Sequence, residues 1–123
     1  MNRDNLVSKV GETGQDKLIA KLFPPAETFG VKVKSGEGPL KRGSVLVLED
    51  NGEYTLLATG TTGKANCVLA DDVDATSAAA VGVAYRTGHF NIKALITKNE
   101  YALTTADKEA LRKGGILLSE MMD

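Results

Sequence analysis

The chain contains a single histidine, His89, and this is the first residue to test for chemistry. An imidazole can act as the general base for a serine or cysteine nucleophile, and Ser44 and Cys67 are the candidates. Neither nucleophile lies on a recognisable elbow or at a helix N-terminus in the sequence. A metal site is no better supported, because one histidine without a His-x-x-x-His pair leaves only carboxylates. The residue types therefore predict no catalytic residue and no metal ligand.

Two loops resemble ligand-binding motifs only in part. Residues 60–64 read Gly-Thr-Thr-Gly-Lys, but Ala65 stands where a phosphate-binding P-loop has its serine or threonine. Asp72 and Asp74 resemble the start of a calcium loop, but Ser77 stands where that loop has its sharp-turn glycine. The sequence therefore predicts no cofactor, and both segments are interpreted as ordinary turns.

Length and composition narrow the class of protein. The 123 residues fit one domain, and 42% hydrophobic with 25% charged residues is ordinary for a globular chain. The lone Cys67 excludes an intrachain disulfide and is interpreted as a small buried hydrophobe. A net charge of −1 argues against a nucleic-acid partner, and no stretch is apolar for long enough to predict a membrane span. Because residues 1–20 lack the order of a signal peptide, we expect synthesis in a cytoplasm.

Residues 28–34 alternate with the period of a β-strand. Apolar and basic side chains would lie on its opposite faces, with Phe29, Val31 and Val33 against Lys32 and Lys34. A glycine-rich break follows at residues 35–39, Ser-Gly-Glu-Gly-Pro, and is the clearest boundary in the sequence. We therefore predict a flexible N-terminal arm at residues 1–36 and a β-rich domain at residues 37–123.

The second of these regions is rich in short apolar or alternating runs. They predict strands at residues 44–48, 53–58, 66–70, 81–85 and 116–118, and a further element at residues 92–96. Asp-Asn-Gly at residues 50–52 is the strongest local signal for a β-hairpin between the first two. The pair Thr87-Gly88 is interpreted as a turn that ends the strand at 81–85.

One helix is predicted near the C-terminus, with signals at both of its ends. Thr104 is a suitable N-cap, with Asp107 three residues later, and Gly114-Gly115 supplies a left-handed stop. The whole pattern predicts a mainly β (α+β) fold. We expect a small β-rich domain with one short C-terminal helix and an extended N-terminal arm.

Three segments carry a resemblance to a known family. They are Leu-Lys-Arg-Gly-Ser-Val-Leu at residues 40–46, Ala-Val-Gly-Val-Ala-Tyr-Arg-Thr-Gly-His-Phe-Asn from residue 80, and Leu-Arg-Lys-Gly-Gly-Ile-Leu at residues 111–117. In this order and spacing they resemble the head decoration (capsid cement) proteins of tailed bacteriophages, the family of the phage lambda head decoration protein. Within the resemblance, Gly88 and Phe90 look like a structural turn of the family.

The resemblance implies a structural protein of the virion and not an enzyme. It implies homotrimers on the outer surface of the expanded head, bound at three-fold sites to the major capsid protein. Such trimers hold neighbouring capsid subunits together against the pressure of packaged DNA. The partners would be the capsid protein and further copies of the chain, made in the cytoplasm of a bacterial host.

The resemblance also implies that an N-terminal arm adds a strand to the shell protein. Carried onto this sequence, the capsid-binding residues are Thr28, Phe29, Val31, Lys32, Val33 and Lys34. Independently, an alternating strand set apart by a glycine-rich break would have unpaired backbone groups, ready for β-augmentation. We therefore expect a chain lacking residues 1–35 to fold and to form trimers but not to decorate capsids.

Two other functions stay open from the residues alone. A small β-rich phage protein could also be a head–tail or tail component, and its copy number in the virion would tell the two apart. A small cytoplasmic enzyme that uses His89 is the other alternative, and substitution of His89 by alanine would then abolish its activity.

Overall fold

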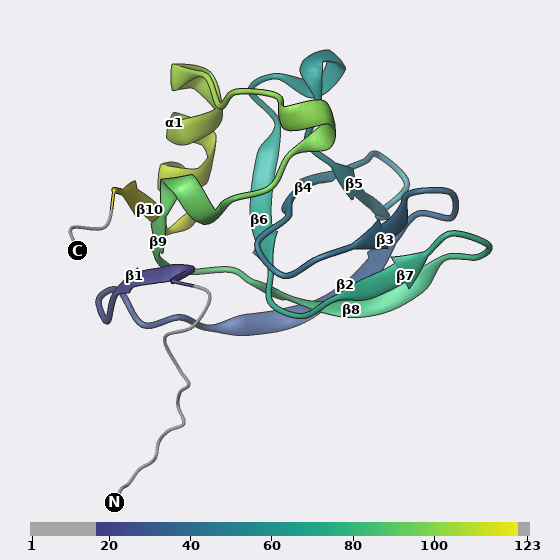
Figure 1. Ribbon diagram of the computed structural model, residues 1–123, viewed down its shortest axis with the longest axis horizontal. Coiled ribbons are helices and arrows are strands. Elements are labelled where there is room, and N and C mark those ends of the chain that lie inside the picture. The colour runs from purple at the N-terminus through teal and green to yellow at the C-terminus, as the bar shows by residue number, and fades with distance from the viewer. Residues whose placement is uncertain (1–16, 121–123) are drawn as a thin grey trace, which may run out of the picture.

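The computed structural model describes residues 17–120, and a closed five-stranded barrel forms the main body (Figure 1). Its strands are β2 (Thr28–Val33), β4 (Val45–Leu48), β5 (Tyr54–Leu56), β6 (Ala65–Leu69) and β8 (Ala80–Tyr85). Around the barrel they follow the order β2-β5-β4-β6-β8. β2 and β8 form the longest ladder, an antiparallel pairing that runs from Thr28 opposite Tyr85 to Val33 opposite Ala80.

Alternating side chains fill the interior of the barrel. In β2, Val31 and Val33 are buried, whereas Gly30 and Lys32 are exposed, as the strand period requires. The alternation predicted for residues 28–34 is therefore confirmed within β2. The barrel core consists of Val31, Val33, Leu40, Leu46, Tyr54, Cys67, Leu69, Ala75 and Ala84.

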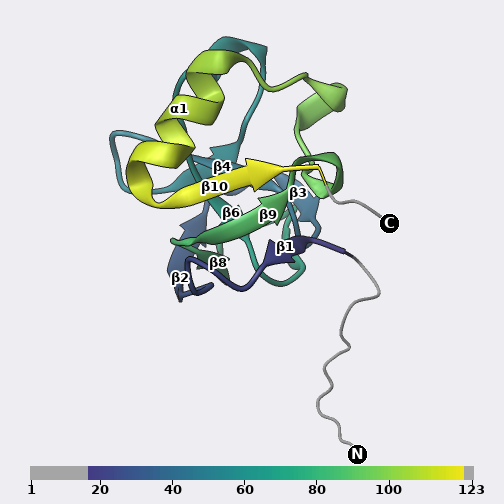
Figure 2. The same ribbon diagram turned by 90° about the vertical axis from the view of Figure 1, so that its left-hand side faces the viewer.

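A second layer covers one side of the barrel. It consists of β1 (Ile19–Lys21), β9 (Gly88–Asn91), α1 (Thr105–Gly114) and β10 (Ile116–Ser119). β9 lies between the other two strands, antiparallel to β1 and parallel to β10, and the helix lies alongside (Figure 2). A second core joins this layer to the barrel and consists of Leu18, Val45, Val47, Leu57, Ala65, Val68, Ala70, Tyr85, Phe90, Leu111 and Ile116.

β4 is buried on both of its faces because it contributes to both cores. Leu46 points into the barrel core, and Val45 and Val47 belong to the second core. All three are at most 1% exposed, which explains why this run of the sequence is continuously apolar and not alternating. The predicted hairpin is confirmed: β4 and β5 pair antiparallel, and Gly52 in their turn has a φ of +89°.

The predicted helix is also confirmed, together with both of its end signals. The Thr104 side chain accepts a hydrogen bond from the Asp107 N–H, and Asp107 accepts one from the Thr104 N–H, which completes a capping box. Gly115 ends the helix in the left-handed conformation, with φ of +105°. Within residues 17–120, no helix is long and apolar enough to cross a membrane.

The segment after β8 differs from its prediction. The strand β9 begins at Gly88, where a turn was expected, and the element expected at residues 92–96 begins as a 3₁₀ turn, η2 (Ile92–Ala94). The Asn91 side chain accepts a hydrogen bond from the Lys93 N–H and so starts this turn. β1 has no counterpart among the predicted strands, because residues 17–23 carry no clear strand alternation.

The remaining elements are short. β3 (Gly38–Leu40) and β7 (Val73–Ala75) form a two-stranded antiparallel pair, and two further 3₁₀ turns are η1 (Thr59–Thr61) and η3 (Lys98–Glu100). The structure is thus mostly β with one short α-helix, which confirms the predicted fold class.

Candidate interaction surfaces

His89 contacts neither Ser44 nor Cys67, the two candidate nucleophiles. Its Nε2 lies 2.9 Å from Oγ of Ser119, a residue on the neighbouring strand β10 that the sequence did not single out. Ser44 is 1% exposed, and its hydroxyl donates to the Lys41 carbonyl. Cys67 is fully buried, and burial raises the pKa of its thiol to about 12. Ser44 and Cys67, the two candidate nucleophiles, are thus enclosed in the fold.

In the part of the chain that the structure describes, the His89–Ser119 pair lacks the other parts of a hydrolytic site. Within residues 17–120, no carboxylate contacts the imidazole to orient it as a base. The same range holds no group of three His, Cys, Asp or Glu side chains that could bind a metal ion. The pair therefore acts as a hydrogen bond between two parallel strands.

The predicted capsid-binding residues lie in β2, whose position differs from the expectation. Their backbone was expected to be unpaired, but β8 pairs with β2 along its whole length. Val31 and Val33 are 3% and 0% exposed, so their side chains hold the barrel together and are not available to a partner. The reason is tertiary: the alternation specifies which face of the strand is apolar, and the barrel supplies the surface that covers it. Residues 1–16 of the predicted arm lie outside the described residues.

Among residues 17–120, no strand lies beside one edge of β2 over most of its length. β5 meets β2 only at Val33 opposite Tyr54, where the Lys34 N–H donates to the Tyr54 carbonyl over 3.0 Å. Backbone groups alternate between the two edges of a strand, so those of Thr28 and Gly30 point to the same edge as those of Lys34. Within the described residues, nothing pairs with them there, and both residues are exposed.

Exposed apolar side chains lie on β8, across β2 from this open edge, and in the chain just before β2. Val81 and Val83 of β8, 80% and 38% exposed, lie opposite Lys32 and Gly30 on the outer wall of the barrel. Because Gly30 has no side chain, Val83 is separated from the open edge only by backbone. Two more exposed hydrophobic residues precede β2 in the chain, Leu22 and Phe23, at 82% and 78%.

The rest of β2 presents polar or basic groups and one aromatic ring. Phe29 is half-buried against Tyr54, with ring centroids 6.3 Å apart, and the Arg86 guanidinium lies 5.5 Å from the centre of the Phe29 ring. Lys32 reaches Glu53 at 3.6 Å on the surface. Of the predicted residues, the structure therefore leaves Thr28, Lys32 and Lys34 exposed and Phe29 partly so.

Gly88 and Phe90 lie in β9 and depend on each other. Gly88 has a φ of +148°, and a Cβ there would lie 2.6 Å from Cζ of Phe90. Phe90 is fully buried and packs on Tyr85, with ring centroids 5.1 Å apart. Only glycine fits beneath this ring, so the pair supports the second core from within a strand instead of from a turn.

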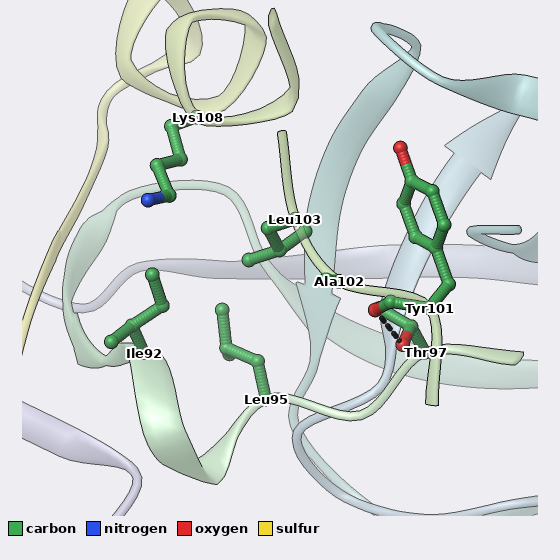
Figure 3. A pocket seen from close by; sticks show the side chains of 7 residues that line it. All are labelled: Ile92, Leu95, Thr97, Tyr101, Ala102, Leu103 and Lys108. Carbon is green, nitrogen blue, oxygen red and sulfur yellow. Dashed lines mark hydrogen bonds between the residues drawn. The ribbon is translucent and has the colours of Figure 1, made fainter. Parts of the chain in front are cut away.

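A cavity of about 190 Å³ opens beside α1, and no sequence pattern indicates it (Figure 3). Ile92, Leu95 and Leu103 converge on it, and the Lys108 side chain extends over the same space. These residues come from η2, from α1 and from the irregular segments between them, which have no period that a sequence pattern could reveal.

Asp107 joins the helix to two other segments. It is fully buried, and its carboxylate accepts hydrogen bonds from the Gly63 N–H and the Tyr101 hydroxyl, both at 2.6 Å, and from the Thr104 N–H at 2.9 Å. Burial acts to raise the pKa of this carboxyl, but the hydrogen bonds, of which that from Tyr101 is the strongest influence, bring it below its ordinary value.

Comparison with known proteins identifies the family but no individual relative. A search of curated proteins gives no match. The model of the bacteriophage lambda head decoration protein D family matches residues 26–116. This match begins just before β2, includes the whole barrel, the cavity and α1, and ends at the first residue of β10. Since it extends over well more than half of the sequence, the chain belongs to the bacteriophage lambda head decoration protein D family.

Proposed function

We propose that this protein binds as a homotrimer to three-fold sites on the outer surface of an expanded phage head and stabilises the shell against DNA pressure. Membership of a head decoration family is the observation that carries the proposal, because it assigns the chain to the phage capsid. The family is structural, and the open edge of β2 offers such a protein a surface for binding.

The open edge of β2 is the surface proposed to contact the major capsid protein. A strand of the shell protein that added to this edge would meet the free backbone groups of Thr28 and Gly30. Each hydrogen bond gained in this way contributes about 0.5–1.5 kcal/mol net, so the backbone contacts of one copy are modest. Val83, next to Gly30, and the exposed Leu22 and Phe23 would add apolar contact.

Thr28, Phe29, Lys32 and Lys34 are proposed to touch the shell at or beside this edge. Val31 and Val33 support the strand from inside the barrel. A strand held in the barrel differs from a free arm in the entropy that it loses on binding. The strand is already ordered by β8, so binding does not require it to fold first, and less conformational entropy is lost.

Three copies in one trimer would bind far more tightly than one. Once the first copy is bound, the other two are held near their own sites at high effective concentration, which raises the overall affinity by about 10² or more. Closed three-fold symmetry also matches a three-fold point on the shell. Modest contacts at each edge are therefore sufficient for stable decoration.

The experiment is a comparison of two substitutions at Gly30. Gly30→Pro removes the N–H that points to the open edge. The hydrogen bonds to β8 stay in place, because the backbone groups of the neighbouring residues Phe29 and Val31 make them. Gly30→Ala keeps the N–H and is the matched control, since nothing lies within 4 Å of an added Cβ. Each purified variant is mixed with expanded, undecorated capsids, and bound protein is measured by co-sedimentation and imaged at the three-fold sites.

We expect the proline variant to bind at least tenfold more weakly and the alanine variant to bind like the original chain. Equal binding by both, with unchanged thermal unfolding, would remove the β2 edge from the contact. The copy number of the protein in purified virions is the second readout. A number near that of the major capsid protein supports decoration, whereas a single ring of copies would indicate a head–tail or tail component instead.

A truncation that tests the N-terminal arm must end before β1. Removal of residues 1–35 would take away Leu18, Val31 and Val33, which are buried in the two cores. Removal of residues 1–16 leaves every described element in place. Loss of capsid binding in that shorter truncation would show that the arm contributes, in addition to the β2 edge.

A further inference from the structure

The cavity beside α1 has an apolar floor, and one lysine lies at its rim. Ile92, Leu95 and Leu103 form the floor, and Lys108 extends over it from the helix (Figure 3). Lys98 follows the lining residue Thr97 directly in the chain and is exposed, like Lys108. Within the described residues neither lysine has an ion-pair partner, although Glu100 lies close to Lys98 in sequence. An occupant with an apolar side chain and adjacent carboxylates would suit this site best.

The turn between β4 and β5 has that chemistry. Leu48 is 46% exposed at the end of β4, and Glu49 and Asp50 follow it directly. Asp50 is exposed and has no described partner, whereas Glu49 accepts a hydrogen bond from Thr55. The turn carries a third carboxylate, Glu53, which is already within 3.6 Å of Lys32.

This turn is held in shape before any partner binds. The Glu49 N–H donates to the Glu53 carbonyl at 2.8 Å, and the Gly52 N–H donates to the Glu49 carbonyl at 3.0 Å. The Asn51 side chain accepts from the Glu53 N–H as well. A turn fixed in this way loses little entropy on binding, which favours it as an inserted group.

Within one copy, the turn and the cavity lie apart. Figure 1 shows α1, β9 and β10 at one end of the long axis and β4 and β5 displaced along it. Two different patches that fit each other, on opposite parts of one chain, form a head-to-tail contact, the type that closes into a ring when the rotation is right. In a ring of three copies, the turn of each copy would occupy the cavity of the next, so that all three turns and all three cavities are paired.

We infer that the trimer interface places the turn at residues 48–50 of one copy in the lysine-rimmed cavity of the next. This inference rests on the proposed homotrimer and names its contact. The leucine side chain fits the space, because an apolar cavity of about 150 Å³ already holds a benzene ring. Leu22 and Phe23 are more exposed than Leu48, but Lys21 precedes them, and its charge would be repelled by the lysine at the rim.

Charge reversal on each side tests the contact. Asp50→Lys places a cation against Lys108, and Lys108→Glu places two carboxylates together. The double variant restores opposite charges with their positions exchanged. Because all three contacts in a ring change at once, we expect each single variant to need at least tenfold more protein to form trimers, and the double variant to recover most of that loss. Oligomeric state is measured by analytical ultracentrifugation over a range of concentrations.

Two exposed charges elsewhere provide the controls, Asp71→Lys and Lys41→Glu, which should assemble normally. All these sites are exposed, so the variants should fold, and thermal unfolding of each one checks this. Single variants that form trimers as readily as the original chain, or a double variant that is no better than the singles, would overturn the inference. A protein that is monomeric at every concentration would overturn it too.

Capsid binding is measured separately on the same variants, so the two proposals can fail independently. If Asp50→Lys leaves a normal trimer that still decorates capsids, the interface is wrong and the proposed function stands. If the original chain forms trimers that the charge reversals disrupt but it does not bind expanded capsids, the interface stands and the proposed function is wrong.

Discussion

The barrel and the layer that covers it are held together by different physics. The barrel core is apolar side chains on alternating strand positions, such as Val33, Leu46 and Leu69, all fully buried. The covering layer also has an apolar core, but it is tied to the η1–β6 connection through the buried carboxylate of Asp107. The stability of the barrel should therefore depend on the volume of its buried side chains. The stability of the layer should depend in addition on the ionisation of Asp107.

The two regions also carry the two proposed contacts. The open edge of β2 belongs to the barrel and faces the shell in our proposal, whereas the cavity between η2 and α1 belongs to the layer and receives another copy. A defect in one contact need not disturb the other. Variants of each region can therefore be used to separate stability, trimer formation and capsid binding.

The largest effect is expected from a cavity in the barrel core. Leu46→Ala removes a fully buried side chain from the central strand β4 and should cost about 2–5 kcal/mol in the free energy of unfolding. Val81→Ala, on the exposed wall of the same barrel, is the control and should change it by less than about 0.5 kcal/mol. Urea unfolding at pH 7 measures both. Similar losses for the two variants would contradict the proposed difference between interior and wall.

The sequence predicted the parts of the fold that depend on near neighbours. Asp50-Asn51-Gly52 specifies a hairpin through its own backbone preferences, and Thr104 with Asp107 specifies a helix start. The alternation around Val31 likewise predicted a strand and its apolar face. The partners of that strand could not be predicted, because alternation does not say which strand pairs with it or which edge stays open.

The role of Gly88 and the presence of the cavity could not be predicted, because both depend on contacts between distant parts of the folded chain. Gly88 looked like a turn because glycine usually marks one, but here the ring of Phe90 occupies the space that a side chain would need. The cavity could not be predicted, because Ile92, Leu95 and Leu103 belong to irregular segments that meet only in the folded chain. The capping residue Asp107 was predicted for its role in the helix, but its bonds to Gly63 and Tyr101 are tertiary.

The second prediction uses pH to distinguish the contribution of Asp107, in the layer, from that of the barrel core. Asp107→Asn replaces an acceptor by an amide that faces the donors of Tyr101 and Thr104, and should cost about 2–3 kcal/mol at pH 7. In the original chain the pKa of Asp107 is lower in the folded state than in the unfolded state. Its contribution is therefore complete at neutral pH and is lost as the pH falls below about 4.

Unfolding measured from pH 7 to pH 3 checks this sign. The original chain and Leu46→Ala should lose stability over the acid part of the range with a similar slope, since both keep the carboxylate. Asp107→Asn should show a shallower slope there. An equally steep acid loss in all three proteins would assign the pH dependence to other carboxyl groups.

A third prediction tests how Gly88 supports the second core. Gly88→Ala combines an unfavourable φ with a clash against Phe90 and should cost about 2 kcal/mol. Phe90→Leu by itself leaves space in the core, but in the double variant the smaller side chain relieves the clash. The double variant should therefore be less destabilised than the sum of the two single changes, as a double-mutant cycle of unfolding free energies would measure.

The smallest effect is expected at His89, although it is the residue that a search for chemistry finds first. His89→Ala removes one hydrogen bond, to Ser119, between two strands whose backbone ladder stays intact, and should cost about 0.5–1.5 kcal/mol. Capsid binding and trimer formation should not change, because the residue belongs to neither proposed contact. The adjacent Gly88→Ala should be clearly more destabilising, which places the importance of this segment in the packing under Phe90. A His89 variant that folds and forms trimers but does not bind capsids would instead make this outer face of the layer part of the shell contact.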